Sequence, residues 1–189
     1  MKNLSNQQEN KHRIYRPNQT KIMNLFILSL IPKEIAEYMM DKHVSKILLE
    51  AVQMLCSAKR IVDPEDPVNE YLYKLAHKNH PVTIWCRASQ ANFVWTLDLV
   101  DALHTEWKYR YGHPESKNHK SFLIAQVLRN RLPKEELFEK IGLTPFALAM
   151  PVEYKCEDAV LAYRNYYMSE EKRKIASWKK KRAKPEWYI

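Results

Sequence analysis

Three side chains of different chemistry, His43, Lys46 and Glu50, follow one another at spacings of three and four residues. In a helix, which turns by about 100° per residue, they lie in one line along about two turns. An imidazole, an amine and a carboxylate in a line can transfer protons, and the amine can attack an electrophilic carbon. The same line also fits a solvated helix face, because Lys46 and Glu50 form an ordinary surface ion pair worth about 0.3–0.5 kcal/mol. Both interpretations remain open from the residues alone.

Asp41 is a fourth candidate, because it falls near the middle of the apolar face of the same helix. Burying a carboxylate without a partner is costly. The residue is therefore either a functional carboxylate with a cation beside it or half of a structural ion pair with an Arg or Lys of another helix.

A long amphipathic helix over residues 32–60 must position these four side chains. Proline at residue 32 suits the first helical position. The apolar face of this helix is formed by Met40, Val44, Ile47, Leu48, Ala51, Val52, Met54 and Leu55.

The rest of the chain also has helical spacing. A second long helix is predicted over residues 81–111 with Gly112 as its cap, and further helices over 121–131 and from about 157. Short helices are expected near residues 69–75 and 133–142, and residues 143–154 are expected to form a loop. Only two glycines are present and no tight-hairpin signal occurs, so strands are disfavoured.

These patterns predict an all-α, compact single-domain helical bundle over residues 23–189, with an extended, buried, apolar segment at 23–29 and irregular loops. Residues 1–22 are polar and basic, and we expect them to form a flexible extension. The tryptophans fit core positions better than base-stacking ones.

The composition indicates the class of partner. Lys and Arg outnumber Asp and Glu by 31 to 22, which gives a net charge of +9 and favours a polyanion, above all DNA. No apolar run reaches the roughly 20 residues that span a bilayer, and no secretory signal is recognisable. Three widely spaced cysteines suit a reducing compartment. We therefore expect an intracellular monomer, neither secreted nor bound to a membrane.

Motifs for cofactors are lacking. The sequence has no P-loop, dinucleotide fingerprint or serine elbow, so no cofactor is expected. His77 and His80 form an H-x-x-H pair, but no third and fourth metal ligand stand at a recognisable spacing, so no metal site is predicted. The C-terminal stretch 171–189 mixes cations with aromatic residues, which suits a phosphate-bearing strand or merely a solubilising terminus.

Several of these stretches together resemble a largely uncharacterised family of small proteins from tailed phages and large DNA viruses. The motifs are M-N-L-F-I-L-S, D-K-H-V-S-K-I-L-L-E-A-V-Q-M-L, N-H-P-V-T-I-W-C-R-A-S, Y-R-Y-G, M-P-V-E-Y-K, A-Y-R-N-Y-Y and P-E-W, between residues 23 and 188. At longer range, D-x-H followed by Glu seven residues after the His resembles the endonuclease V type pyrimidine-dimer DNA glycosylases, which are all-helical. This resemblance implies that Asp41 and His43 match the D-x-H and that Glu50 matches the catalytic carboxylate.

The resemblance also has departures. In those glycosylases the α-amino group at the processed N-terminus attacks the sugar C1′, whereas the equivalent Met23 and Asn24 here follow 22 other residues, and Leu49 replaces the basic residue before the family's Glu. Lys46 is then the candidate amine.

The leading hypothesis is a viral DNA repair or modification enzyme of glycosylase/lyase type, acting in the host cytoplasm or at a viral replication site. The alternatives are a non-enzymatic DNA-binding accessory protein and a metal-assisted nuclease that uses His77, His80 and a carboxylate. The residues expected to contact DNA are His80, Arg87, Lys179, Lys180, Lys181, Arg182 and Trp187.

Overall fold

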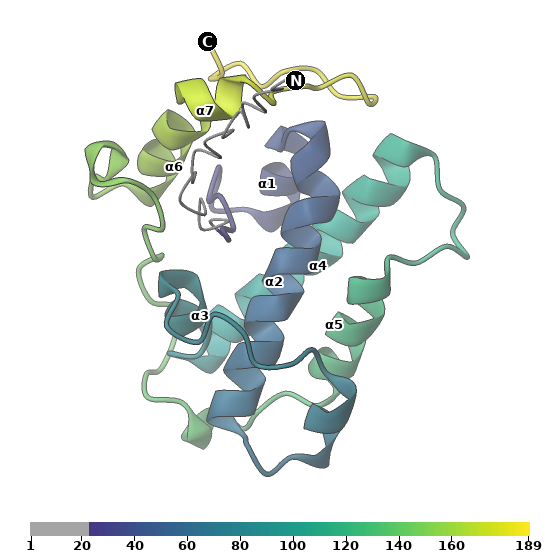
Figure 1. Cartoon of the computed structure of the whole chain (residues 1–189), viewed down its shortest axis with the longest axis vertical. Coiled ribbons are helices and arrows are strands. Elements are labelled where there is room, and N and C mark those ends of the chain that lie inside the picture. The colour runs from purple at the N-terminus through teal and green to yellow at the C-terminus, as the bar shows by residue number, and fades with distance from the viewer. Residues whose placement is uncertain (1–22) are drawn as a thin grey trace, which may run out of the picture.

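Two antiparallel helices of 22 residues each, α2 (Asp41–Val62) and α4 (Gln90–Tyr111), form the centre of the molecule. The computed structural model describes residues 23–189. At about 1.5 Å per residue, each helix is roughly 33 Å long. Helix α2 packs against α4, α3 and α5, and most of its residues are buried, the exposed ones being Lys42 and Ile61 near its two ends (Figure 1). Its side chains are therefore positioned by contacts with several other elements.

The helix predicted over residues 32–60 is divided in two. Helix α1 (Pro32–Tyr38) ends at Met39, and both Met39 and Met40 have extended backbone with ψ near 145°. The break is stabilised by tertiary contacts, because the Met40 amide donates to the Tyr167 hydroxyl at 2.8 Å and the Met39 carbonyl accepts from Arg110 at 2.6 Å. Local helical spacing gives no signal of such distant partners.

The helix predicted over residues 81–111 is also divided, into α3 (Pro81–Cys86) and α4. Ser89 separates them, and its hydroxyl accepts from the Asn92 amide at 3.1 Å, a typical N-cap of a new helix. Gly112 caps the end of α4 with φ of 63°, as the sequence predicts.

The remaining elements are shorter. The predicted helix near residues 133–142 is reduced to one turn of 3₁₀ helix, because three glutamates and two lysines leave it little apolar surface to bury. The elements are η1 (Pro67–Tyr71), α5 (Lys120–Asn130), η2 (Glu135–Leu137), η3 (Val152–Tyr154), α6 (Ala159–Tyr167) and α7 (Glu170–Arg173).

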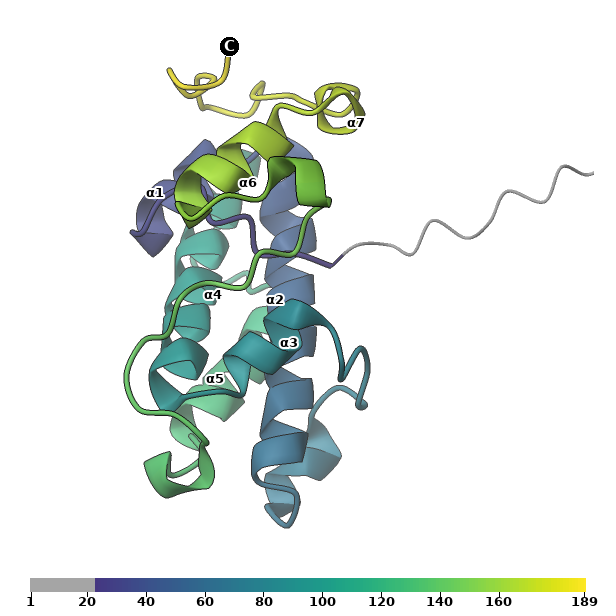
Figure 2. The same cartoon turned by 90° about the vertical axis from the view of Figure 1, so that its left-hand side faces the viewer.

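Two irregular segments cover one end of the central helices. Residues 23–29 are all buried, as predicted, and lie between α2 and α6 (Figure 2). Helices α6 and α7 and the C-terminal stretch close the end at which α2 begins and α4 finishes (Figure 1). No strand forms within residues 23–189, so the predicted all-α class is confirmed. The predicted extension, residues 1–22, lies outside the described part of the chain.

Candidate active site

Glu50 and Lys46 lie on successive turns of α2, at a place where a buried carboxylate meets an amine that reaches the surface. Glu50 is only 4% exposed, and its Oε1 is 3.6 Å from the Lys46 Nζ, whose side chain is 36% exposed. The amide nitrogen of Asn24 donates to the Glu50 Oε2 at 3.4 Å. The carboxylate is thus shielded from bulk water while one of its partners remains accessible.

The segment that brings Asn24 to Glu50 is held tightly. Asn24 is fully buried, and its Nδ2 donates to the Ala149 carbonyl at 2.6 Å. Its Oδ1 accepts from the amides of Leu25 and Phe26 at 2.9 and 3.3 Å, which turns the chain so that Phe26 takes a positive φ of 49°. These contacts fix the Asn24 backbone nitrogen over the carboxylate.

His43 is on the same face but has a different environment. It is 1% exposed, stacks on Phe26 with ring centroids 4.9 Å apart, and places its Nδ1 2.8 Å from the Tyr167 hydroxyl. Burial, together with the charges of Lys46 and Lys172, lowers the pKa of His43 to about 3. The imidazole is therefore neutral near pH 7. Its contacts with Phe26 and Tyr167 hold residues 23–28 and helix α6 against α2.

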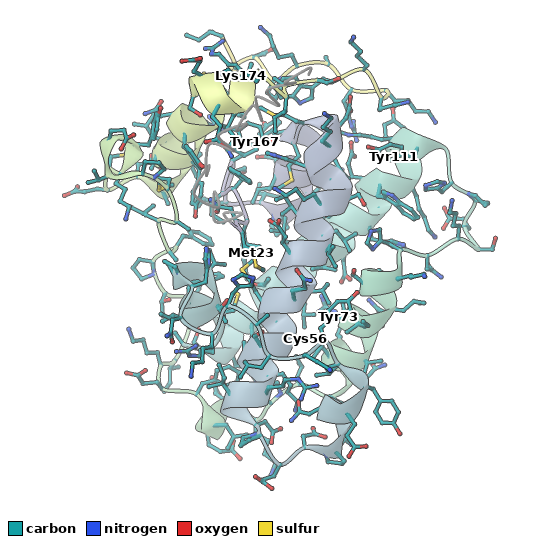
Figure 3. The ribbon with its side chains drawn as sticks, in the orientation of Figure 1. Met23, Cys56, Tyr73, Tyr111, Tyr167 and Lys174 are labelled. Carbon is teal, nitrogen blue, oxygen red and sulfur yellow. The ribbon has the colours of Figure 1, made fainter. Side chains whose placement is uncertain are left out.

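The polar line on α2 is more enclosed than its spacing suggests. His43 and Glu50 are buried and Lys46 is only partly exposed, because the segment around Asn24 and Phe26 lies over this face. Figure 3 shows Met23 beside α2 and Tyr167 above it, so the segment and α6 meet the helix on the same side. The structure therefore pairs Glu50 with Lys46, whereas His43 contacts Phe26 and Tyr167.

Asp41 lies in an ion pair with a cation of another helix. Its Oδ1 accepts from the Nη1 of Arg110 on α4 at 3.1 Å, and its Oδ2 accepts from the Ser177 hydroxyl at 3.0 Å and the Lys179 amide at 2.8 Å. Of the two roles open from the sequence, the ion pair with a cation of another helix is the one observed.

Arg110 extends this ion pair into a buried network. The guanidinium is fully buried and also pairs with Glu106, which in turn accepts from Arg182 at 2.8 Å. Burial by itself would raise the pKa of Glu106, but hydrogen bonds from Arg182 and Arg110 outweigh burial and hold this pKa below its usual value. The network ties the C-terminal stretch to α1, α2 and α4.

Among the C-terminal residues proposed to contact DNA, the lysines face solvent and Trp187 faces the protein. Lys179, Lys180 and Lys181 are exposed to solvent, and the latter two lie over the rings of Tyr111 and Tyr109. The cations are therefore available to phosphates.

The aromatic residues of this stretch face the protein. Trp187 packs against Tyr38 at 6.0 Å and lies under the guanidinium of Arg164 at 4.9 Å, while Trp178 donates to the Tyr38 carbonyl at 3.0 Å. Base stacking on Trp187 therefore requires its release from these contacts.

His80 and Arg87 flank α3. The His80 Nδ1 accepts from the Val82 amide at 3.2 Å, so this side chain caps the helix, and burial lowers its pKa, with a further effect of His77. Arg87 donates to the Lys78 carbonyl across the turn before α3. Within residues 23–189, no three His, Cys, Asp or Glu side chains are grouped closely enough to hold a metal ion.

Sequence reasoning missed Asn24, Arg110 and Tyr167, which build the surroundings of the site. Asn24 was visible as a polar residue inside the apolar segment 23–29, and Arg110 as a cation between two tyrosines at the end of a helix. Tyr167 carried no comparable signal, because its role depends on α6 folding back onto the break before α2.

No protein-family model, curated protein or solved structure matches this chain. None of the helices in the described part is long and apolar enough to cross a membrane. The function of the site must therefore be inferred from its own atoms.

Proposed function

We propose that this protein is a DNA-acting enzyme of the glycosylase/lyase type, in which Glu50 is the catalytic carboxylate and Lys46 the attacking amine. The observation that carries this proposal is the 3.6 Å approach of the Lys46 Nζ to a carboxylate that is 4% exposed. An amine needs a proton acceptor before it can attack carbon, and a carboxylate shielded from water is a stronger acceptor and a stronger electrostatic partner than one in solution.

The proposed reaction begins with transfer of a proton from the Lys46 ammonium to Glu50. The freed lone pair forms a bond to the sugar C1′, and the bond between C1′ and the base nitrogen breaks with its electron pair leaving on the base, which takes up a proton. The sugar ring then opens as the ring oxygen leaves C1′ with its electron pair and takes up a proton, and loss of the proton on the Lys46 nitrogen gives an imine. Loss of a C2′ proton then breaks the bond from C3′ to oxygen, whose electron pair leaves on the phosphate. Glu50 is the nearest group of the site to carry these protons.

The surroundings support this division of roles. The Asn24 nitrogen is an amide within the chain, so it can donate to Glu50 but cannot act as a nucleophile. His43 is neutral and buried, and it holds the segment over α2 rather than reaching a substrate. The exposed lysines of the C-terminal stretch and the net charge of +9 provide attraction to phosphates.

Trapping the imine tests the proposal. The full chain is incubated with a duplex that contains an abasic site, in EDTA and borohydride, and the covalent complex is measured on a denaturing gel. Lys46→Ala should reduce the trapped complex to background. Lys42→Ala is the matched control, because Lys42 is an exposed lysine of the first turn of the same helix, and it should trap normally.

Two results would contradict the proposal. Undiminished trapping by Lys46→Ala would assign the amine to another residue. DNA binding by the native protein without any trapping or base release would instead indicate a non-enzymatic DNA-binding accessory protein, and cleavage that EDTA abolishes would indicate a metal-assisted nuclease.

A further inference from the structure

A cavity lies at the other end of α4 from Ser89, where α4 turns toward α5. It has a volume of about 640 Å³ and is lined by His104, Lys108 and Tyr109 of α4, His113 of the following turn, Phe122 of α5 and Lys181 of the C-terminal stretch. A cavity of this size is within the range of small-molecule sites, about 300–1,000 Å³. Figure 3 shows Tyr111, at the end of α4, on the opposite side of α2 from Met23, so this cavity is separate from the Glu50 site.

Two ammonium groups line the cavity. The Lys108 Nζ donates to the carbonyl oxygen of Glu115 at 2.6 Å and to its carboxylate at 3.2 Å, which leaves one of its three donors available. Lys181 lies 5.4 Å from the centre of the Tyr109 ring and forms no ion pair with any of residues 23–189. The Glu115 side chain is 96% exposed, so the opposing carboxylate lies at the rim.

One wall of the cavity is aromatic. His104 stacks on Phe122 with centroids 3.6 Å apart and nearly parallel rings, and Tyr109 is 47% exposed. Burial, followed by the charges of Lys108 and His119, lowers the pKa of His104 to about 4, so near pH 7 this ring is neutral. His104 is only 5% exposed, so Tyr109 is the aromatic side chain that a ligand can reach.

We propose that this cavity binds a nucleotide, with its phosphate near Lys181 and Lys108 and its base against the exposed ring of Tyr109, which His104 and Phe122 back. The positive charge selects an anion, and the planar wall beside it selects a ring system. The same chemistry is offered by a free nucleotide and by an unpaired nucleotide of a strand. This inference does not depend on Glu50 or on any catalysis.

Calorimetric titration of the full chain at low salt tests this site. The ligands are deoxyadenosine monophosphate, deoxyribose 5-phosphate, inorganic phosphate and a short oligothymidylate. Deoxyadenosine monophosphate should bind about tenfold more tightly than deoxyribose 5-phosphate, the scale of one base stacked on an aromatic ring. Lys181→Ala should weaken it by about tenfold, the scale of one charge-assisted hydrogen bond.

Two control variants define the outcomes. Lys174→Ala removes an exposed lysine of the same C-terminal region that pairs with Glu170, and it should leave binding unchanged. Glu50→Gln should also leave it unchanged, which separates this site from the proposed catalytic one.

Binding of the oligothymidylate alone, weakened by Lys181→Ala, supports the site and identifies its ligand as a strand, whereas binding of the mononucleotide identifies a free nucleotide. Equal affinity for the two phosphates with and without a base, an unchanged Lys181→Ala variant, or no heat with any ligand would overturn the proposal.

Discussion

Helix α2 carries two buried carboxylates nine residues apart, Asp41 and Glu50, which are 6% and 4% exposed. Asp41 is closed in by partners from two other regions, because Arg110, Ser177 and the Lys179 amide approach it within 3.1 Å. The contacts of Glu50 with Lys46 and the Asn24 amide are longer, at 3.6 and 3.4 Å.

The difference teaches that burial alone does not identify a functional carboxylate. At Asp41, short contacts to a guanidinium, a hydroxyl and an amide satisfy both oxygens and join three distant parts of the chain, which describes a structural role. At Glu50, a partly exposed amine lies beside the buried carboxylate, which is the arrangement that the proposed proton transfer needs. The partners, and not the exposed fraction, separate the two.

The largest expected effect comes from removing the cation of the Asp41 network. Arg110→Met should lower the free energy of unfolding by about 3–5 kcal/mol, because the carboxylate of Asp41 then remains buried without a compensating charge and Glu106 keeps Arg182 alone. Three backbone carbonyls before α2 also lose their donor. Urea denaturation monitored by circular dichroism measures the change.

Arg129→Met is the matched control for this variant. Arg129 also bridges two carboxylates, those of Asp98 and Asp101, but its partners are 50% and 42% exposed, so its loss should cost no more than about 1 kcal/mol. Equal losses from the two variants would show that the Arg110 network contributes no more than a surface ion pair.

A smaller effect is expected at Glu50, and on activity rather than on stability. Glu50→Gln keeps the size and the acceptor facing Asn24 but removes the charge and the proton acceptor beside Lys46. The rate of base release or strand cleavage should fall by about 100-fold, the scale of a general acid or base. Single-turnover assays with a substrate that the native protein cleaves measure this rate.

Asp41→Asn should lower stability rather than activity, the opposite of what is expected for Glu50→Gln. It should destabilise the fold by about 1–3 kcal/mol, since an amide replaces an oxygen that accepts from the Lys179 amide and the Ser177 hydroxyl. Its rate per folded molecule should stay near that of the native protein. A Glu50→Gln variant of full activity, or an Asp41→Asn variant of normal stability, breaks the distinction between the two carboxylates.

The sequence predicted the parts of this arrangement that depend on local spacing. Helical periodicity and the positions of proline and glycine were sufficient for the all-α class and the cap at Gly112. The continuous apolar character of residues 23–29 was sufficient for the burial of that segment. Helical geometry likewise placed Lys46 and Glu50 one turn apart, and the structure confirms their ion pair.

Other features depend on contacts between residues far apart in sequence. The break at Met39 and Met40 is stabilised by Arg110 and Tyr167, which lie about 70 and 127 residues further along the chain. The choice between a functional and a structural Asp41 depended on the same distant arginine. Periodicity contains no information on such pairs, so neither the break nor the role of Asp41 could be decided from the residues.

His43 lies between the two carboxylates on α2, and the smallest expected effect is on its protonation. Its pKa is about 3 in the folded protein against an ordinary value of 6.5, chiefly because it is buried. Between these values the unfolded chain binds a proton that the folded protein does not, so acidification favours unfolding. The contribution of His43 to stability is fully present above pH 6.5 and falls by up to about 1.4 kcal/mol for each pH unit below it.

His43→Gln should remove this contribution, so its stability should fall less steeply than that of the native protein between pH 6 and pH 4. Urea denaturation at half-unit intervals gives both curves, and their difference isolates His43 from the other histidines. Tyr167→Phe is the control: it deletes the hydroxyl 2.8 Å from Nδ1 but leaves His43 buried, so its curve should be lower and parallel to the native one. A His43→Gln curve parallel to the native one would show that the imidazole takes up protons within the fold, and would return His43 to the groups that can act with Glu50.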